Sequence, residues 1–273
     1  MEISCTETVP SSAMPIIPLA GGRMPGMWMA AALIATYFAL QAVAAGLFVL
    51  VLGVAARFGN GWHAVDGAMA ATLAQPAMQA LLVLLSLGVA APLTLLLAHR
   101  RWPQLWSLAR PPGFGFTPPR RPLLLVLAVA VGLVIPVLGG LLTQLLAQGH
   151  AVTQDIQQIG SRTPLALRIP LVLLVVSVGP VVEELLFRGV LLSALLQRWR
   201  VGWAIAISSL TFALVHLPGL QYQWYALPNL ILLATALAWL RLRSDSIWPS
   251  ILAHGTNNLL AVVAWFVAIN LPG

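Results

Sequence analysis

Two adjacent glutamates and an arginine stand inside one long apolar run of the sequence. Of the seven acidic residues in the chain, Glu183 and Glu184 lie in this run together with Arg188. A charge at the centre of a membrane helix costs about 2.5–3.5 kcal/mol even on a lenient scale, so these side chains need partners or a polar cavity. On a helix, an acid four residues before a base shares its face, which predicts a Glu184–Arg188 pair. Glu183 is rotated by about 100° from that pair and is free to do chemistry, although a purely structural ion-pair network also fits this segment.

Two later apolar stretches carry histidines. His216 follows Phe212 by four residues, and His254 precedes Asn258 by four, so that the last two share a helix face. Alone, each set also fits a structural role, as a hydrogen-bonded histidine at a helix end or as polar side chains that bridge helices. Together, a carboxylate can take a proton from water, an imidazole can orient that water or protonate a leaving amine, and an amide can donate to an oxyanion. The combination therefore supplies the groups needed to activate water and to hold an oxyanion.

The order of these residues resembles the intramembrane CAAX-protease and bacteriocin-processing family, also called the abortive-infection family. The similarity extends over about Pro164 to Ala268 and includes the flanking stretches LLFRGVLL and SIWPSILAH. Its three motifs are Glu183-Glu184-x-x-x-Arg188, Phe212-x-x-x-His216 and His254-x-x-x-Asn258.

This resemblance implies a type II CAAX prenyl endopeptidase-like enzyme with a conical cavity inside the membrane. Glu183 would activate water with help from His216, while His254 and Asn258 would complete the catalytic site, Asn258 as oxyanion donor. The residues implied to support the site are Glu184, Arg188 and Phe212. The substrate would be a peptide or protein, and a lipid anchor on it should not be assumed.

Two other hypotheses stay open. The main expectation is a site without a metal or other cofactor, because the helical His-Glu-x-x-His arrangement of zinc proteases is missing. Glu183, His216 and His254 could instead be zinc ligands, with Glu184 as the base. A non-enzymatic membrane protein, such as a proton-coupled transporter or a bacteriocin-immunity protein, is the alternative of another class, because buried glutamates and histidines also form proton relays.

The elements that must position these residues are membrane helices. Hydrophobic residues make up 60% of the 273, charged residues 8%, and the mean hydropathy is +0.92. Continuous apolar runs predict an all-α, polytopic membrane helix bundle rather than a barrel. We expect about seven spans near Met27–Ala56, Ala77–Ala98, Leu123–Gln148, Ile169–Gln197, Val201–His216, Trp224–Leu240 and Ile247–Ile269. These divide the chain into a polar tail (1–26), two helices with an arginine-rich loop (27–121) and the protease-like core (122–273).

All 14 positive charges are arginines, and they predict the orientation. With a cytoplasmic N-terminus, ten arginines lie on the cytoplasmic side and three on the other, with Arg188 left inside a span, as the positive-inside rule requires. Composition favours a bacterial plasma membrane. The arginines form no patterned basic face, which argues against nucleic-acid binding. In the loop Arg100–Arg121, Trp102 and Trp106 are expected at lipid headgroup level.

The N-terminal tail contains Cys5, the single cysteine, which excludes an intrachain disulfide and a cysteine-based metal site. The tail also lacks the charged and apolar regions of a cleaved signal peptide. The oligomeric state cannot be read from the sequence.

Overall fold

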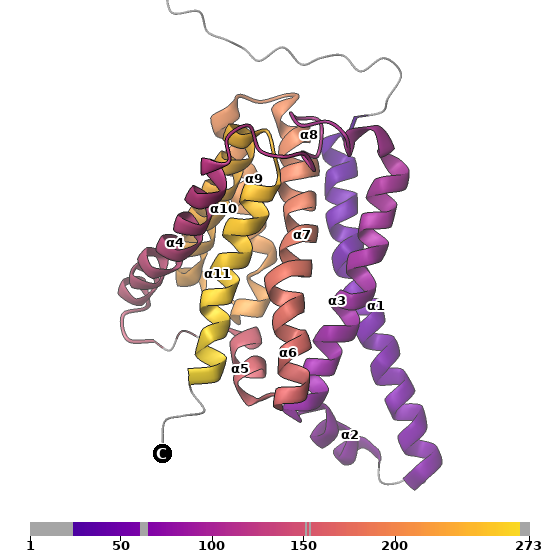
Figure 1. Ribbon diagram of the computed structural model, residues 1–273. Coiled ribbons are helices and arrows are strands. Elements are labelled where there is room, and N and C mark those ends of the chain that lie inside the picture. Colours follow the sequence, from indigo (N-terminus) through magenta and orange to yellow (C-terminus); the bar gives the residue numbers. More distant parts are fainter. Residues whose placement is uncertain (1–23, 61–64, 151, 153, 268–273) are drawn as a thin grey trace, which may run out of the picture.

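Every regular element in the described part of the chain is a helix (Figure 1). The computed structural model describes residues 24–60, 65–150, 152 and 154–267. Most of the predicted polar tail lies outside these ranges. The α-helices are α1 (Met27–Asn60), α2 (Val65–Leu73), α3 (Pro76–Arg101), α4 (Leu123–Ala147), α5 (Asp155–Arg162), α6 (Leu165–Leu173), α7 (Gly179–Glu184), α8 (Leu192–Leu196), α9 (Val201–Val215), α10 (Leu227–Ser244) and α11 (Trp248–Val267). The predicted all-α membrane bundle is confirmed.

Five segments of the described residues are long and apolar enough to cross a membrane, where the sequence predicted seven. They are Met27–Phe58, Pro76–Arg101, Leu123–Ala147, Leu165–Leu196 and Trp224–Ser244. Helix α9 is apolar but has only 15 residues. Helix α11 has 20 residues and is not one of the five. His254 lies in α11, and His216 directly follows the last residue of α9.

The span Leu165–Leu196 contains two π-helical segments. They are Leu174–Val178 and Leu185–Leu191, and they flank the short helix α7, which holds both glutamates. Pro180 stands in the first turn of α7, directly after a π turn. A proline lacks the backbone N–H of a regular helix, and here the chain continues through the proline without ending the span. Segments of π-helix inside α-helices occur frequently at functional sites.

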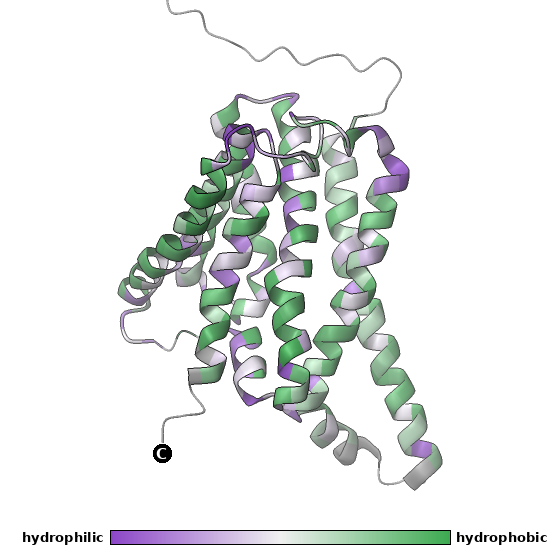
Figure 2. Cartoon of the chain, viewed as in Figure 1, coloured by the Kyte–Doolittle hydropathy of each residue, from purple (hydrophilic) through white to green (hydrophobic). Residues whose placement is uncertain are grey.

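The helices pack as two groups on either side of this span. Helices α1 and α3 lie side by side, and α4, α10 and α11 pack together on the opposite side (Figure 1). Hydrophobic residues cover most of the outer faces of α1, α3 and α4, whereas hydrophilic residues occur in the middle of α7 and α11 (Figure 2). The short helices α2 and α5 were not predicted. They lie at the end of the bundle opposite the segment between α3 and α4 (Figure 1).

The arginine-rich segment between α3 and α4 folds across one end of the bundle. Trp102 was expected at headgroup level, but its side chain does not face lipid, because it is only 2% exposed and its ring packs edge-on against Phe114. Trp106 is partly buried and stacks on Phe116 at 4.8 Å between ring centroids. Prolines and glycines allow the segment between α3 and α4 to turn back over the helix ends. The two tryptophan side chains pack between this segment and the helices.

Buried charges hold this segment to the turn between α10 and α11. The Arg241 guanidinium donates hydrogen bonds to the carbonyls of Ala109 and Gly113, at 2.8 and 2.7 Å. Asp245 forms ion pairs with Arg110 and Arg120. These contacts connect the segment that follows α3 to the end of α10 and the turn before α11. The segment is therefore part of the folded bundle and not a loop that contacts only the membrane surface.

Close contact between α4 and α11 requires a glycine at position 132. A Cβ atom there would lie 2.5 Å from the Ala253 carbonyl oxygen and 2.7 Å from Thr256 Cβ. Gly132→Ala is therefore expected to lower the unfolding free energy by about 1–3 kcal/mol, the usual cost of overpacking. Gly140, in the same helix, has open space at its Cβ position, so Gly140→Ala is the matched control. Thermal unfolding in detergent measures both, and an equal effect of the two substitutions would contradict the prediction.

Candidate active site

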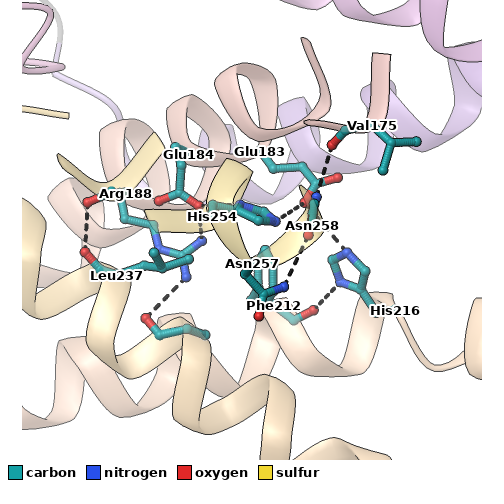
Figure 3. A network of polar contacts seen from close by, with 12 residues as sticks. Val175, Glu183, Glu184, Arg188, Phe212, His216, Leu237, His254, Asn257 and Asn258 are labelled. Atoms are coloured by element: carbon teal, nitrogen blue, oxygen red, sulfur yellow. Dashed lines mark hydrogen bonds and ion pairs between the residues drawn. The ribbon is translucent and has the colours of Figure 1, made fainter. Parts of the chain in front are cut away.

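Glu183 lies between the two predicted histidines. Its Oε2 atom is 3.5 Å from His216 Nε2 and 3.7 Å from His254 Nε2, as Figure 3 shows. The three side chains come from α7, the end of α9 and the middle of α11. Glu183 remains 20% exposed and His216 32%, whereas His254 is 5% exposed. The residues predicted from three separate motifs therefore meet, and the meeting point is partly accessible.

Glu184 faces the other way and is completely buried. Arg188 Nη1 donates to Glu184 Oε1 at 2.9 Å, which confirms the predicted pair. The same oxygen lies 2.9 Å from His254 Nδ1. Arg188 also donates to the carbonyl of Ala234 in α10. The division between one exposed and one paired glutamate follows from their adjacency on a helix, because adjacent side chains point in directions about 100° apart.

The hydrogen bonds fix which nitrogen of each imidazole faces Glu183. His216 Nδ1 lies 2.7 Å from the carbonyl oxygen of Phe212, and an oxygen that can only accept requires a proton on that nitrogen. His254 Nδ1 in the same way donates to the Glu184 carboxylate. In a neutral imidazole the Nε2 atom then carries a lone pair, and both Nε2 atoms face the Glu183 carboxylate. The lone pairs of the two Nε2 atoms and the negative charge of the Glu183 carboxylate repel one another. One proton held between Glu183 and the two histidines removes this repulsion, so the arrangement favours it.

The Phe212 ring contacts both histidines and the Arg188 guanidinium. Its ring lies 4.5 Å from the His216 ring and 5.7 Å from the His254 ring, measured between centroids. The Arg188 guanidinium carbon is 4.6 Å from the centre of the same ring. Phe212 is 1% exposed, so this cation–π contact is desolvated. The aromatic residue of the second motif thus orders both the charged pair and the imidazoles.

Asn258 follows His254 by four residues and therefore lies on the same side of α11 (Figure 3). Its Nδ2 donates to the carbonyl of Val175, at 3.0 Å, in the first π-helical segment. Asn257 Nδ2 donates to Asn258 Oδ1 at 3.2 Å, which fixes the amide orientation. The side-chain NH2 of Asn258 has two N–H donors, and the bond to Val175 occupies one of them. The second N–H remains for another acceptor.

The sequence did not identify Tyr37 of α1 as a neighbour of the site. Its side chain is 1% exposed, and its hydroxyl has no hydrogen-bond partner among the described residues. Helix α1 packs against the π-helical segment Leu185–Leu191, which directly follows the two glutamates. The sequence does contain one indication of this position, namely a tyrosine within an otherwise apolar span. A buried tyrosine hydroxyl usually has a hydrogen-bond partner, so such a tyrosine predicts a polar group nearby.

The hydrogen bonds of the two histidines are relevant to the alternative hypothesis of a zinc site. A histidine that binds a metal through Nε2 generally donates its Nδ1–H to a carboxylate or carbonyl, as both histidines do here. However, no group of three or more histidine, cysteine, aspartate or glutamate side chains within the described ranges has an arrangement that could hold a metal ion.

The helical bundle and its internal glutamate–histidine cluster define a polytopic membrane protein with a polar centre. Residues 165–260 match the family model described as type II CAAX prenyl endopeptidase Rce1-like. A stretch of 100 residues is 35% identical to the "Putative membrane peptidase YdiL" of Bacillus subtilis (strain 168) and covers 35% of this chain and 37% of that protein. No solved structure matches the chain. The part of the chain that carries the site is therefore similar to type II CAAX prenyl endopeptidases, in agreement with the resemblance of its motifs, and the chain spans about a third of the length of the peptidase it matches.

Proposed function

We propose that the protein is an intramembrane endopeptidase in which Glu183 activates water for attack on a peptide bond. The observation that carries this proposal is the meeting of one accessible carboxylate with two imidazoles whose Nε2 atoms face it. The match of the segment to a peptidase family and the similarity to a bacterial protein named as a peptidase support it.

In the proposed reaction, the Glu183 carboxylate takes a proton from water while the water oxygen attacks the carbonyl carbon of the substrate. The second N–H of Asn258 donates to the resulting oxyanion. As the carbon–nitrogen bond breaks, the proton passes to the leaving amine, with His216 and His254 Nε2 as relay atoms. The second proton of the attacking water also passes to the amine, so the products are a new carboxylate and a new ammonium group. Glu184, Arg188 and Phe212 hold the histidines without entering the reaction.

The proposed orientation places the arginine-rich end of the bundle in the cytoplasm. The ends of α3, α8 and α10 and the segment that joins α3 to α4 all lie at this end (Figure 1). The asymmetry in arginine supports a cytoplasmic N-terminus and, with the composition, a bacterial plasma membrane. The substrate would be a membrane-associated peptide or protein that reaches Glu183 from within this bilayer.

A comparison of cleavage products tests the function directly. Membranes from cells that express the wild-type protein or Glu183→Ala would be compared by mass spectrometry of protein C-termini. New C-termini are expected with the wild-type protein only, because alanine cannot take the proton from water. Identical C-termini, with both proteins inserted in equal amounts, would contradict the proposal.

Metal analysis distinguishes the proposed mechanism from the zinc alternative. Purified protein washed with chelator is expected to stay active without stoichiometric zinc. Activity that disappears with the metal and returns with added zinc would favour the alternative, in which Glu183, His216 and His254 are ligands.

A further inference from the structure

A groove runs along the outer surface between α1 and α3, at the end of the bundle that carries the arginine-rich segment. Its volume is about 410 Å³. Met29 and Leu33 of α1 and Leu97 of α3 supply apolar walls, and Arg100, Arg101 and Trp102 lie where α3 ends. Hydrophilic residues are concentrated at this end of α3, above its apolar face (Figure 2). The groove is therefore hydrocarbon along its length and cationic at one end.

The groove faces the membrane and not the candidate active site. Leu97 is 44% exposed, and Ala32, another lining residue, is also exposed. Both helices belong to segments that are apolar and long enough to span a bilayer. In the membrane, such a lipid-facing groove is in contact with acyl chains, and its polar end lies at headgroup depth.

Arg100 and Arg101 differ from the other arginines at this end of the bundle. Arg110 and Arg120 form ion pairs with Asp245, and Arg241 donates to backbone carbonyls. By contrast, the side chains of Arg100 and Arg101 form no ion pair or hydrogen bond with any residue that the structure describes, and the Arg101 guanidinium carbon lies 5.9 Å from the centre of the Trp102 ring.

Trp102 adds a second polar feature at the cationic end. It is 2% exposed, and its indole Nε1 has no hydrogen-bond partner in the described part of the chain. A buried N–H without a partner is costly and is normally satisfied. Two cations without an ion pair to any described residue thus adjoin a hydrocarbon groove, and Trp102 lines the same end.

We propose that this groove is a binding site for one anionic phospholipid. The phosphodiester lies against Arg100 and Arg101, and an acyl chain lies along Met29, Leu33 and Leu97. Guanidinium groups suit this role because they bind phosphate oxygens through two parallel hydrogen bonds. The proposal does not depend on peptidase activity.

Native mass spectrometry of the full-length protein in detergent tests the site. Phosphatidylglycerol would be titrated against phosphatidylcholine with the wild-type protein and two double variants. Arg100→Gln/Arg101→Gln removes the charges of the groove, whereas Arg198→Gln/Arg200→Gln removes two exposed charges from the connection between α8 and α9. Each arginine near an anionic lipid contributes about 1 kcal/mol, so the groove variant is expected to bind phosphatidylglycerol roughly tenfold or more weakly than the control variant.

A third variant tests the apolar part of the site and does not depend on the arginines. Ala32→Phe fills the groove from its exposed side and is expected to weaken binding of phosphatidylglycerol with all charges intact. Equal losses in the two double variants, equal affinity for both lipids, or unchanged binding by Ala32→Phe would each overturn the proposal. Displacement of the lipid by millimolar inorganic phosphate would also overturn it, because the site would then recognise free phosphate.

Discussion

Glu183→Gln is expected to lower the rate of peptide hydrolysis by roughly 10²–10⁴-fold, the usual contribution of a general base. Glutamine keeps the size of the side chain and its oxygen but cannot accept the proton from water. The effect would be measured as the initial rate of hydrolysis of a synthetic peptide. The peptide would contain a cleavage site identified by the comparison of C-termini in membranes. A rate within tenfold of the wild-type value would contradict the role of Glu183.

The same variant should leave the fold intact. Glu183 is partly exposed and takes no part in the buried Glu184–Arg188 pair. Its thermal unfolding midpoint in detergent is therefore expected to stay close to that of the wild-type protein. His216→Ala is the companion variant, because it removes a proposed relay atom while leaving Glu183 in place. A large loss of stability in Glu183→Gln would mean that lost activity reflects lost structure.

Arg188→Met should have the largest effect on stability. The substitution keeps an apolar stem but leaves the buried Glu184 carboxylate with His254 as its remaining side-chain partner. Glu184 Oε2 already has no hydrogen-bond partner among the described residues. Removal of one member of a buried ion pair typically costs about 3–5 kcal/mol, so little folded protein should survive extraction. Thermal unfolding and gel filtration in detergent would measure this loss.

Two further variants separate the buried pair from a general effect of charge. Arg198→Met removes an exposed arginine and should change the unfolding temperature little. The double variant Glu184→Gln/Arg188→Met removes both charges and should recover part of the stability, because no unpaired ion stays buried. If Arg188→Met unfolds at the same temperature as Arg198→Met, the ion pair has no structural role.

The sequence was sufficient to predict the helical bundle and the grouping of the polar residues. Continuous apolar runs determine the class of fold, because a backbone in lipid must satisfy its own hydrogen bonds. The Glu184–Arg188 pair follows from spacing alone, since four residues return a helix to the same face. The meeting of Glu183 with His216 and His254 required the resemblance between three motifs and a known family, because helix periodicity does not state which helices are neighbours.

Other features could not be read from the sequence because they depend on tertiary contacts. Trp102 carries an amphipathic side chain beside two arginines, which is typical of a headgroup position, yet it packs against Phe114. Arg241 is one of the ten arginines counted on the cytoplasmic side, and its burial under the carbonyls of the segment between α3 and α4 could not be predicted from that count. In both cases, the contacting groups belong to the segment between α3 and α4, which supplies the Phe114 ring to Trp102 and backbone carbonyls to Arg241.

The two π-helical segments around α7 set the direction in which the glutamates point. A π turn contains one residue more than an α turn, so the side chains after it are rotated relative to those of an uninterrupted α-helix. One of these segments, Leu174–Val178, precedes Glu183, and the other, Leu185–Leu191, contains Arg188. The face that carries the acidic pair therefore follows from these inserted residues and not from the α-helical period alone.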